Sequence, residues 1–370
     1  MKKIIVRGPA LSLSGYGEHA RFVLRSLRKY PEMFDIYLIN VPWGTTGWVW
    51  EDNEERTWID QILGKTIEYG QNGGTFDVSV QVQIPNEWEK IAPINIGITA
   101  GIESTKMSPQ WLEGCLRMDK IITISNHAKY ALETTEYPAR NNQTGENIIA
   151  KTTCPVEVVS YPVKEVEKDK GFKLDLKHDF NFLAVGTYIP RKNLDNTIKW
   201  FVEEFFDEEV GLIVKTCTTK GSIRDRIQTE KKLSSLLEDY KGRKCQVYLL
   251  HGDMSENEIT SLYQHPKVKA FVSLTHGEGF GLPLYEAAYN GLPILAPDWG
   301  GHIDFLYMKT KDKKGWHQVK IKAEVAFFEL PKEAMRTRIA VFPFRLYEVQ
   351  SDKGRFQRLL DQNINDYLVQ

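Results

Sequence analysis

Residues 276–301 have the sequence HGEGFGLPLYEAAYNGLPILAPDWGG, and this stretch decides the fold. An apolar run, VKAFVSL over 268–274, precedes it and predicts a buried strand. The glycine-rich turn 277–281 then leads into a predicted helix over 283–290. A second apolar run follows over 294–296. Strand, glycine turn, helix and strand together predict a βαβ unit, which binds its ligand at the carboxyl ends of its strands.

Two carboxylates, Glu278 and Glu286, frame the glycine turn. The glycines between them carry no Cβ atom, so backbone N–H groups can approach a ligand closely. The N-terminus of the following helix adds a partial positive charge that suits a phosphate. A carboxylate can accept hydrogen bonds from both hydroxyls of a ribose. The pattern predicts a phosphate at the turn, a sugar near Glu278 and a ribose at Glu286.

This stretch resembles the E-x7-E motif of GT-B-fold retaining glycosyltransferases, the group that includes glycosyltransferase family 4 (glycosyl transferases group 1). The matching residues are Glu278, Gly279, Phe280, Gly281, Leu282, Glu286, Ala287, Gly291, Pro293, Ile294, Gly300 and Gly301. The resemblance implies an α/β protein with two Rossmann-like domains that face each other across a cleft, and a C-terminal helix that crosses back to the first domain. It also implies a nucleotide-diphosphate sugar, UDP- or GDP-linked, as co-substrate, retention of anomeric configuration, and no permanently bound cofactor.

A second donor motif follows the predicted strand 180–185. Members of the family show G-R-x-x-x-x-K here, and both basic groups hold the donor diphosphate. Gly186 and Lys192 match this pattern, whereas Thr187 stands where the arginine is usual. We expect Arg191 to replace the missing guanidinium, because arginine binds phosphate in a forked geometry. The alternative for Arg191 is a solvated surface position.

The first half of the chain opens with a predicted strand, a loop over 8–17 and a helix over 18–30. Gly15 and Gly17 in that loop have the geometry of a phosphate-facing turn, and the resemblance implies a glycine-rich loop at this place. Glu18 and His19 are either a solvated first turn or functional residues. The basic part of this helix is a candidate for contact with a membrane surface, although its arginines equally fit a solvated face.

A third part of the resemblance is T-x-x-E-x-x-x-x-P-x-x-W after the strand predicted over 94–98. Glu103 and Trp111 hold the matching places. Many members carry a histidine near the reacting carbon at the end of this strand, where this chain has Ala100 and Gly101. The departure shifts the expected catalytic role to Glu103. Further on, Ser125 is predicted to cap the next helix.

Two further segments each have two interpretations, and a third predicts a loop. Residues 43–58 are rich in tryptophan and are either an acceptor-binding loop with stacking faces or packing beneath a loop. Residues 309–322 are basic with one tryptophan and are either an anion-binding patch or a solvated hairpin. Residues 134–151 are polar and predict an exposed loop.

The length of 370 residues predicts two domains, over 1–165 and 178–345, joined by a charged linker. A helix over 353–370 is expected to pack back on the first domain. No run of about 18 apolar residues occurs, so no membrane-spanning helix is expected. The N-terminus predicts a strand rather than a secretion signal, which favours a cytoplasmic location, with contact at the inner membrane surface as a further option. The scattered cysteines predict buried thiols rather than disulfides or zinc ligands.

The most specific function that the sequence supports is therefore transfer of a sugar from a nucleotide-sugar to a glycan, a lipid-linked sugar or a small molecule. No Asp-x-Asp occurs, so no metal clamp is expected. Three alternatives stay open: glycosylation of modified nucleic acid bases, a non-catalytic nucleotide-sugar-binding module, and a sugar phosphorylase. The formal net charge of −1 disfavours a nucleic acid acceptor. No sequence feature fixes the oligomeric state.

Overall fold

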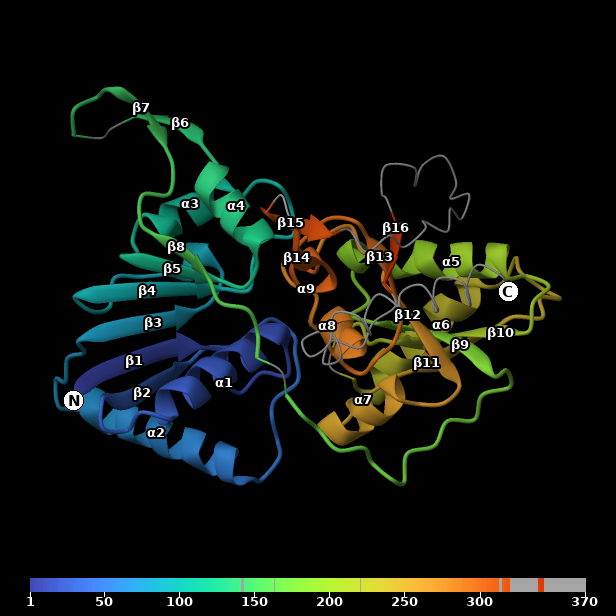
Figure 1. The fold of residues 1–370 in the computed structure, drawn as a ribbon. Helices are drawn as coiled ribbons and strands as arrows, with labels where there is room; N and C mark the ends of the chain where they lie inside the picture. The colour runs from blue at the N-terminus through green and yellow to red at the C-terminus, as the bar shows by residue number, and fades with distance from the viewer. Residues whose placement is uncertain (141–142, 163, 220, 313–314, 320–338, 343–370) are drawn as a thin grey trace. The chain divides into compact units, whose positions relative to one another are not determined.

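The computed structural model describes residues 1–140, 143–162, 164–219, 221–312, 315–319 and 339–342. The chain forms two compact units (Figure 1). The first comprises Met1–Pro162 together with Glu278–Phe280, and the second comprises Val163–Gly277 and Gly281–Gln370.

The first unit is built on a parallel six-stranded sheet in the order β2-β1-β3-β4-β5-β8. The strands are β1 (Lys2–Gly8), β2 (Phe34–Asn40), β3 (Val78–Val82), β4 (Ile94–Thr99), β5 (Lys120–Thr123) and β8 (Val156–Val158). The helices are α1 (Gly15–Arg28), α2 (Glu54–Gln71), the 3₁₀ turn η1 (Pro85–Glu87), α3 (Pro109–Cys115) and α4 (Asn126–Thr134). The strand predicted at the start of the chain and the strand predicted over 94–98 are present as β1 and β4, because parallel strands are buried on both faces and need apolar runs.

The core of this unit forms where α1 packs on the sheet. Ile4 and Val6 of β1 are buried together with Ala20 and Leu24 of α1. The two helical residues are four apart and therefore share one face of α1. This packing fixes where the N-terminus of α1 lies relative to the end of β1.

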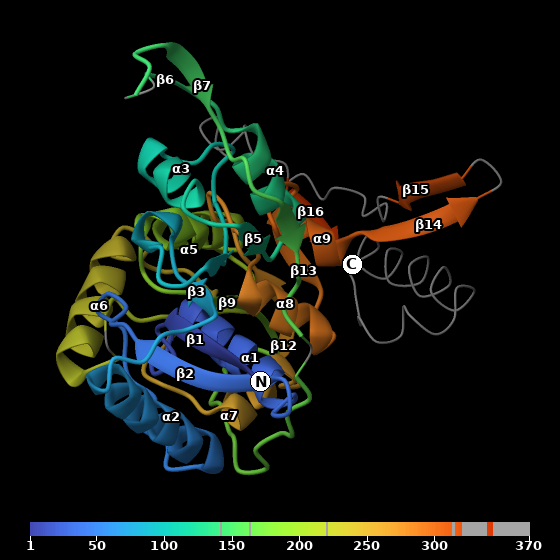
Figure 2. The same ribbon diagram turned by 90° about the vertical axis from the view of Figure 1, so that its left-hand side faces the viewer.

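Two local predictions in the first unit are wrong. Helix α1 begins at Gly15 rather than after Gly17, because the Ser14 side chain accepts a hydrogen bond from the Gly17 backbone and caps the helix. Residues 134–151 are not only a loop: β6 (Tyr137–Arg140) and β7 (Asn147–Ala150) pair as an antiparallel hairpin. Both views show this hairpin extending beyond α3 and α4 (Figures 1 and 2). Its strands bury little, and Ile148 and Ile149 of β7 are 42% and 57% exposed, so no alternation of buried apolar and exposed polar residues marks them.

The second unit contains another six-stranded sheet, in the order β11-β10-β9-β12-β13-β16. The strands are β9 (Phe180–Val185), β10 (Val210–Lys215), β11 (Gln246–Leu250), β12 (Val268–Val272), β13 (Ile294–Pro297) and β16 (Ile339–Phe342). They run parallel except β16, which pairs antiparallel with β13. The helical segments are η2 (Pro190–Lys192), α5 (Leu194–Glu204), α6 (Ile223–Leu236), α7 (Glu256–Tyr263), α8 (Leu282–Tyr289) and α9 (Ile303–Leu306).

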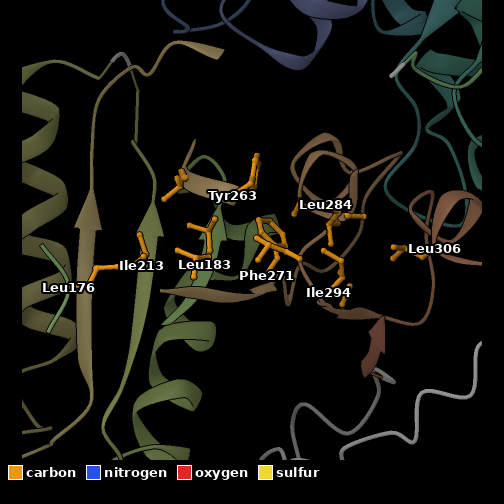
Figure 3. Close-up of a cluster of buried hydrophobic side chains, with 14 residues drawn as sticks. Leu176, Leu183, Ile213, Tyr263, Phe271, Leu284, Ile294 and Leu306 are labelled. Atoms are coloured by element: carbon orange, nitrogen blue, oxygen red, sulfur yellow. The ribbon is translucent and has the colours of Figure 1, made fainter. Parts of the chain in front are cut away.

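Figure 3 shows the buried apolar cluster to which Tyr263 of α7 and Leu284 of α8 belong. Leu183 of β9 and Phe271 of β12 are fully buried, and Leu284 of α8 packs in the same cluster. Leu176 also belongs to this cluster and is 6% exposed. The charged segment before β9, predicted as a linker, is therefore anchored in the second unit at its C-terminal end.

The last part of the chain is described only in pieces. The backbone of β14 (Met308–Asp312) pairs antiparallel with β15 (Gly315–Val319), so the basic segment predicted over 309–322 contains a hairpin. The predicted domain end at 345 and the predicted helix over 353–370 lie outside the described residues.

All four cysteines lie in the described part of the chain and are free thiols. Cys115 and Cys245 are buried, whereas Cys154 and Cys217 are half-buried. The prediction that the cysteines form no disulfide is confirmed, and the prediction that they are buried holds fully for two of them.

Candidate functional site

The second sheet changes direction of winding between β9 and β12. The chain passes from β9 to β10 on one side, and β12 later pairs with the other side of β9. Open α/β sheets bind ligands at such a switch point, outside the carboxyl ends of the strands. Two segments border it: residues 186–193 after β9 and residues 273–281 after β12. Both contain predicted donor-binding residues.

The segment after β9 carries Gly186, Thr187, Arg191 and Lys192. The Lys192 side chain runs past Gly186: a Cβ atom built on that glycine would lie 3.4 Å from Lys192 Cδ. Thr187, which stands in the place of the usual arginine, is exposed. Arg191 and Lys192 form the end of the η2 turn, so their positions are set by a defined backbone.

Arg191 joins this segment to the turn after β12. Its Nη1 donates to the carbonyl oxygen of Gly277 at 2.8 Å. Its own carbonyl accepts from the backbone N–H of His276 at 2.9 Å and from Thr275 Oγ1 at 3.0 Å. The predicted alternative of a merely solvated Arg191 is wrong, because the residue is half-buried and its guanidinium is hydrogen-bonded.

Asn193 makes a second link between the same two segments. Its side-chain Nδ2 donates to the carbonyl oxygen of Leu274 at 3.0 Å. Its backbone has φ 54°, the left-handed conformation, and among described non-glycine residues only Asn193 has positive φ. Asparagine tolerates this conformation better than most residues. Asn193 was not among the predicted site residues, although asparagine is typical of turns that need this conformation.

The glycine turn leads directly into α8. Glu278 is 5% exposed and Phe280 is 3% exposed, while Gly279 is also buried. Gly281 is the N-cap of α8 with φ 89°, and a Cβ atom there would lie 2.7 Å from Leu284 Cδ1. Leu282 is the first residue of the helix. This turn therefore requires glycine at 281 for backbone and packing reasons together.

Glu286 lies in the second turn of α8 and is exposed. The phenolic hydroxyl of Tyr263, at the end of α7, donates to Glu286 Oε2 at 3.1 Å. Burial, reinforced by the neighbouring Glu286 carboxylate, holds the pKa of Tyr263 well above its usual range. Tyr263 therefore stays a neutral donor and orients the carboxylate predicted to bind ribose.

A buried contact between His251 and Asp225, not predicted from the sequence, joins the segment after β11 to the first turn of α6. His251 Nε2 lies 3.1 Å from Asp225 Oδ2, and these side chains are 4% and 2% exposed. Asp225 also accepts from the backbone N–H groups of Thr218 and Thr219. Burial alone would raise the pKa of Asp225, but the hydrogen bonds from Thr219, His251 and Thr218 lower it overall. His251 directly follows the apolar run of β11, whereas no sequence pattern marks Asp225.

Other candidate residues lie in the first unit. Gly15 is exposed in the first turn of α1, and Gly17 is buried there. A Cβ atom on Gly17 would lie 2.0 Å from the carbonyl oxygen of Ser12, so this glycine has a packing role. Glu103 is half-buried in the segment after β4. Ser125 accepts from the backbone N–H of Ala128, and the prediction that it caps α4 is confirmed.

The first turn of α1 is not a solvated surface. His19 is 6% exposed, and burial lowers its pKa to about 3. Glu18 pairs with Arg21 at 2.7 Å and with Arg25 at 2.8 Å. Arg21 is 8% exposed, and Arg25 also pairs with Glu55. Two of the arginines suggested for membrane contact therefore form ion pairs inside the first unit.

A cavity of about 560 Å³ lies elsewhere in the second unit. Val268, the first residue of β12, lines it, as does Leu292 just before β13. It therefore lies at the amino ends of these strands, opposite the edge that carries Arg191 and Lys192. Searched over the described residues, no helix is long and apolar enough to cross a membrane, and no group of three or more His, Cys, Asp or Glu could hold a metal ion.

Residues 166–317 match the family model described as Glycosyl transferases group 1. This segment, which is less than half of the chain, is similar to that family. It contains the whole switch point of the second sheet, including both linked segments and α8.

One curated relative is the O-antigen chain mannosyltransferase RfbU of Salmonella typhimurium. It is 27% identical over 194 residues, which cover 51% of this chain and 51% of the relative. The chain thus spans about half the length of that relative.

Solved structures share the fold. A sucrose-phosphate synthase from Thermosynechococcus elongatus has a TM-score of 0.54 at 13% identity, covering 83% of this chain and 84% of that chain. A trehalose-6-phosphate structure from E. coli, bound with UDP-2-fluoro glucose, has a TM-score of 0.51 at 10% identity, covering 82% of this chain and 86% of that chain. The predicted α/β GT-B fold, with two Rossmann-like parallel sheets, is confirmed.

Proposed function

We propose that this protein is a retaining glycosyltransferase that moves a sugar from a nucleotide-diphosphate sugar to an acceptor hydroxyl. The observation that carries the proposal is the link from Arg191 to Gly277 at the switch point of the segment that is similar to the glycosyl transferases group 1 family. It brings a basic segment and a glycine turn to one edge of one sheet. The mannosyltransferase name of the curated relative favours a mannosyl donor.

The leaving diphosphate is the first group that the site must stabilise. Lys192 and Arg191 supply positive charge, and Gly186 leaves room for the lysine side chain. The backbone N–H groups of residues 279–281 act as further donors at the start of α8. Such preorganised donors lower the barrier most when they meet charge that develops in the transition state. Cleavage of the anomeric C–O bond puts that charge on the diphosphate.

The two carboxylates act on the other parts of the donor. Glu278 orients the sugar hydroxyls and stabilises the oxocarbenium-like ring, as a carboxylate does in glycoside chemistry. Glu286, the second acid of the E-x7-E motif, holds the ribose and is oriented by Tyr263. Thr187 and Leu282 border the same donor.

The first unit supplies the acceptor side in this proposal. Glu103 takes a catalytic role at the carboxyl edge of its sheet, where members of the family have a histidine nearby. Gly15 and Gly17 let the start of α1 approach the donor. The acceptor is a glycan, a lipid-linked sugar or a small molecule, and transfer needs no metal ion. We assign the protein to the cytoplasm, with contact at the inner membrane surface an open option.

Nucleotide release from UDP-, GDP-, ADP- and dTDP-sugars, without acceptor, tests the proposal. We expect one donor to be hydrolysed slowly by the wild-type protein and not by Glu286→Ala. Glu230→Ala is the matched control, because Glu230 is an exposed helical residue that pairs with Arg226 of its own helix. The anomeric configuration of a transferred sugar, measured by NMR, tests retention. Absence of turnover with every donor, together with no thermal stabilisation by any of them, would leave a non-catalytic module as the better description.

A further inference from the structure

The segment between β2 and α2, residues 41–53, carries three tryptophans in two different environments. We call it the tryptophan loop. Trp43 stacks on Tyr16 of α1 with ring centroids 4.3 Å apart. Trp48 and Trp50, in contrast, are 54% and 77% exposed. Trp58, which the sequence analysis grouped with them, lies in α2 and packs against the core of the first unit.

Hydrogen bonds hold the tryptophan loop in place on the segment that precedes α1. The backbone N–H of Leu13 donates to Gly47 O, and that of Val49 donates to Leu11 O, both at 2.9 Å. Ser12 and Trp48 face each other as an antiparallel bridge between these bonds. The two exposed indoles therefore stand on a fixed backbone, so little conformational entropy is lost when they bind a ligand.

The tryptophan loop lies at the carboxyl edge of the first sheet, where ligands of α/β proteins bind. β1 and β2 are neighbours and parallel, so the segments that follow them meet at the carboxyl edge of the first sheet. Asn40 at the end of β2 accepts from the Leu11 backbone at 3.0 Å and confirms that the two segments touch. This is the edge that also carries Glu103 after β4. Ligands of α/β sheets bind at such edges.

The chemistry of the loop selects among ligands. An indole face is a large apolar surface that stacks on the C–H face of a pyranose ring, and leaving two of them in water is unfavourable. Glu51 and Asp52 follow Trp50 directly and are exposed. Their carboxylates accept hydrogen bonds from sugar hydroxyls. The same carboxylates repel a polyanion, so the loop fits a neutral saccharide and not a nucleic acid.

We propose that Trp48 and Trp50 form an acceptor subsite that binds a neutral glycan by stacking on its sugar rings. This inference rests on the proposed glycosyltransferase function and names its acceptor class. The residues act in binding and not in the transfer step, so they should affect acceptor affinity and leave donor hydrolysis unchanged.

Calorimetric titration of the full chain with neutral tetrasaccharides tests the inference. The probes are an α-linked mannotetraose, maltotetraose and cellotetraose. We expect saturable binding of at least one probe, and about tenfold or greater weakening in the double variant Trp48→Ala/Trp50→Ala. Trp50→Phe should keep part of the affinity because it retains an aromatic face.

Tyr30→Ala is the matched control. Tyr30 is an aromatic residue of similar exposure, 51%, but it follows α1 and precedes β2, at the opposite edge of the sheet. Its removal should leave glycan affinity unchanged. The double variant should also keep the wild-type melting temperature, which shows that it folds.

Three results would overturn the inference: no probe binds the wild-type protein, the double variant binds as tightly as the wild type, or single-stranded DNA binds in a tryptophan-dependent way in place of the glycans. Donor hydrolysis is read in parallel. If the wild-type protein hydrolyses no donor, the result counts against the proposed function. If the double variant binds glycans as tightly as the wild type, the result counts only against the subsite.

Discussion

The guanidinium of Arg191 donates to the carbonyl oxygen of Gly277 across 2.8 Å, so a residue after β9 holds the turn after β12. The Arg191 carbonyl accepts from the His276 backbone in return. One residue is thus bonded through both its side chain and its backbone to the segment that leads into the glycine turn. The Arg191 guanidinium and the backbone of residues 276–277 are therefore held in a fixed geometry.

Arg191→Ala should damage donor binding more than loss of a charge alone would. It removes a charge-assisted hydrogen bond, worth about 1.5–3 kcal/mol, and frees the turn after β12. We expect the donor KM in the nucleotide-release assay to rise by about tenfold or more. Arg191→Lys should raise the donor KM less, because the ammonium group keeps the positive charge but cannot form the forked, two-point hydrogen bonds of a guanidinium.

Arg226→Ala is the control for this substitution, since Arg226 is an exposed helical arginine of the same unit. Its donor KM should equal that of the wild-type protein. Equal KM values for the Arg191 and Arg226 variants would remove Arg191 from the donor site.

Asn193 allows the backbone and side-chain contributions at the switch point to be separated. Both Asn193→Gly and Asn193→Ala lose the hydrogen bond from Nδ2 to Leu274 O. Only alanine also has to adopt the left-handed conformation, with φ 54°. We expect the alanine variant to be less stable than the glycine variant by about 1 kcal/mol in chemical denaturation. An alanine variant as stable as the glycine variant would show that the backbone relaxes away from this conformation.

Local sequence patterns were sufficient to predict the elements that carry the site. The predicted strand over 180–185 coincides with β9, because an apolar run stands between a charged segment and a glycine. The capping box of α7 follows the sequence pattern of a serine, Ser255, with a glutamate three residues later, Glu258, and both of its hydrogen bonds are present. Such features depend on residues within one turn or strand of each other.

Features that join distant segments could not be predicted in this way. The link from Arg191 to Gly277 spans 86 residues of sequence. The bond from Tyr263 to Glu286 spans 23, and Asp225 lies 26 residues from His251. The types of these residues do not indicate their hydrogen-bond partners, because only the strand order and the helix packing bring the partners close together. The hairpin of β6 and β7 was missed for another reason: its strands have no buried face to produce an alternating pattern.

Gly17 and Gly64 form a matched pair of helical glycines with opposite expected effects. A Cβ atom on Gly17 would lie 2.0 Å from the backbone oxygen of Ser12, a clash that only a backbone shift can relieve. Gly17→Ala should therefore destabilise the protein by about 1–3 kcal/mol. A methyl group added to Gly64, in α2, would meet no atom within 4 Å, so Gly64→Ala should stabilise the protein by about 0.5–1 kcal/mol.

Thermal denaturation of the two glycine variants against wild type measures both effects. A Gly17→Ala protein that melts at or above the wild-type temperature would contradict the close approach of α1 to the Ser12 carbonyl. A change of donor KM in Gly17→Ala with unchanged melting temperature would instead point to a direct role at the ligand.

His19 should make the protein sensitive to mild acid. Burial lowers its pKa to about 3, from a usual value near 6.5, and its ring packs edge-on against Tyr161 at 4.8 Å. The unfolded chain therefore binds a proton below about pH 6.5, whereas the folded chain does not until about pH 3. The stability that neutral His19 contributes is complete above about pH 6.5 and is lost as the pH falls, by at most about 1.4 kcal/mol per pH unit.

The difference between wild type and His19→Gln isolates this effect, because glutamine is uncharged at every pH. Between about pH 7 and 5 the unfolding free energy of the wild-type protein should fall more steeply than that of the variant. Glu18 is the nearest acid along the chain, and although burial opposes it, Arg21 and Arg25 lower its pKa, so it does not titrate in this range. Parallel pH profiles would mean that the His19 imidazole is protonated inside the folded protein, and α1 would then have to admit a charge beside Tyr161.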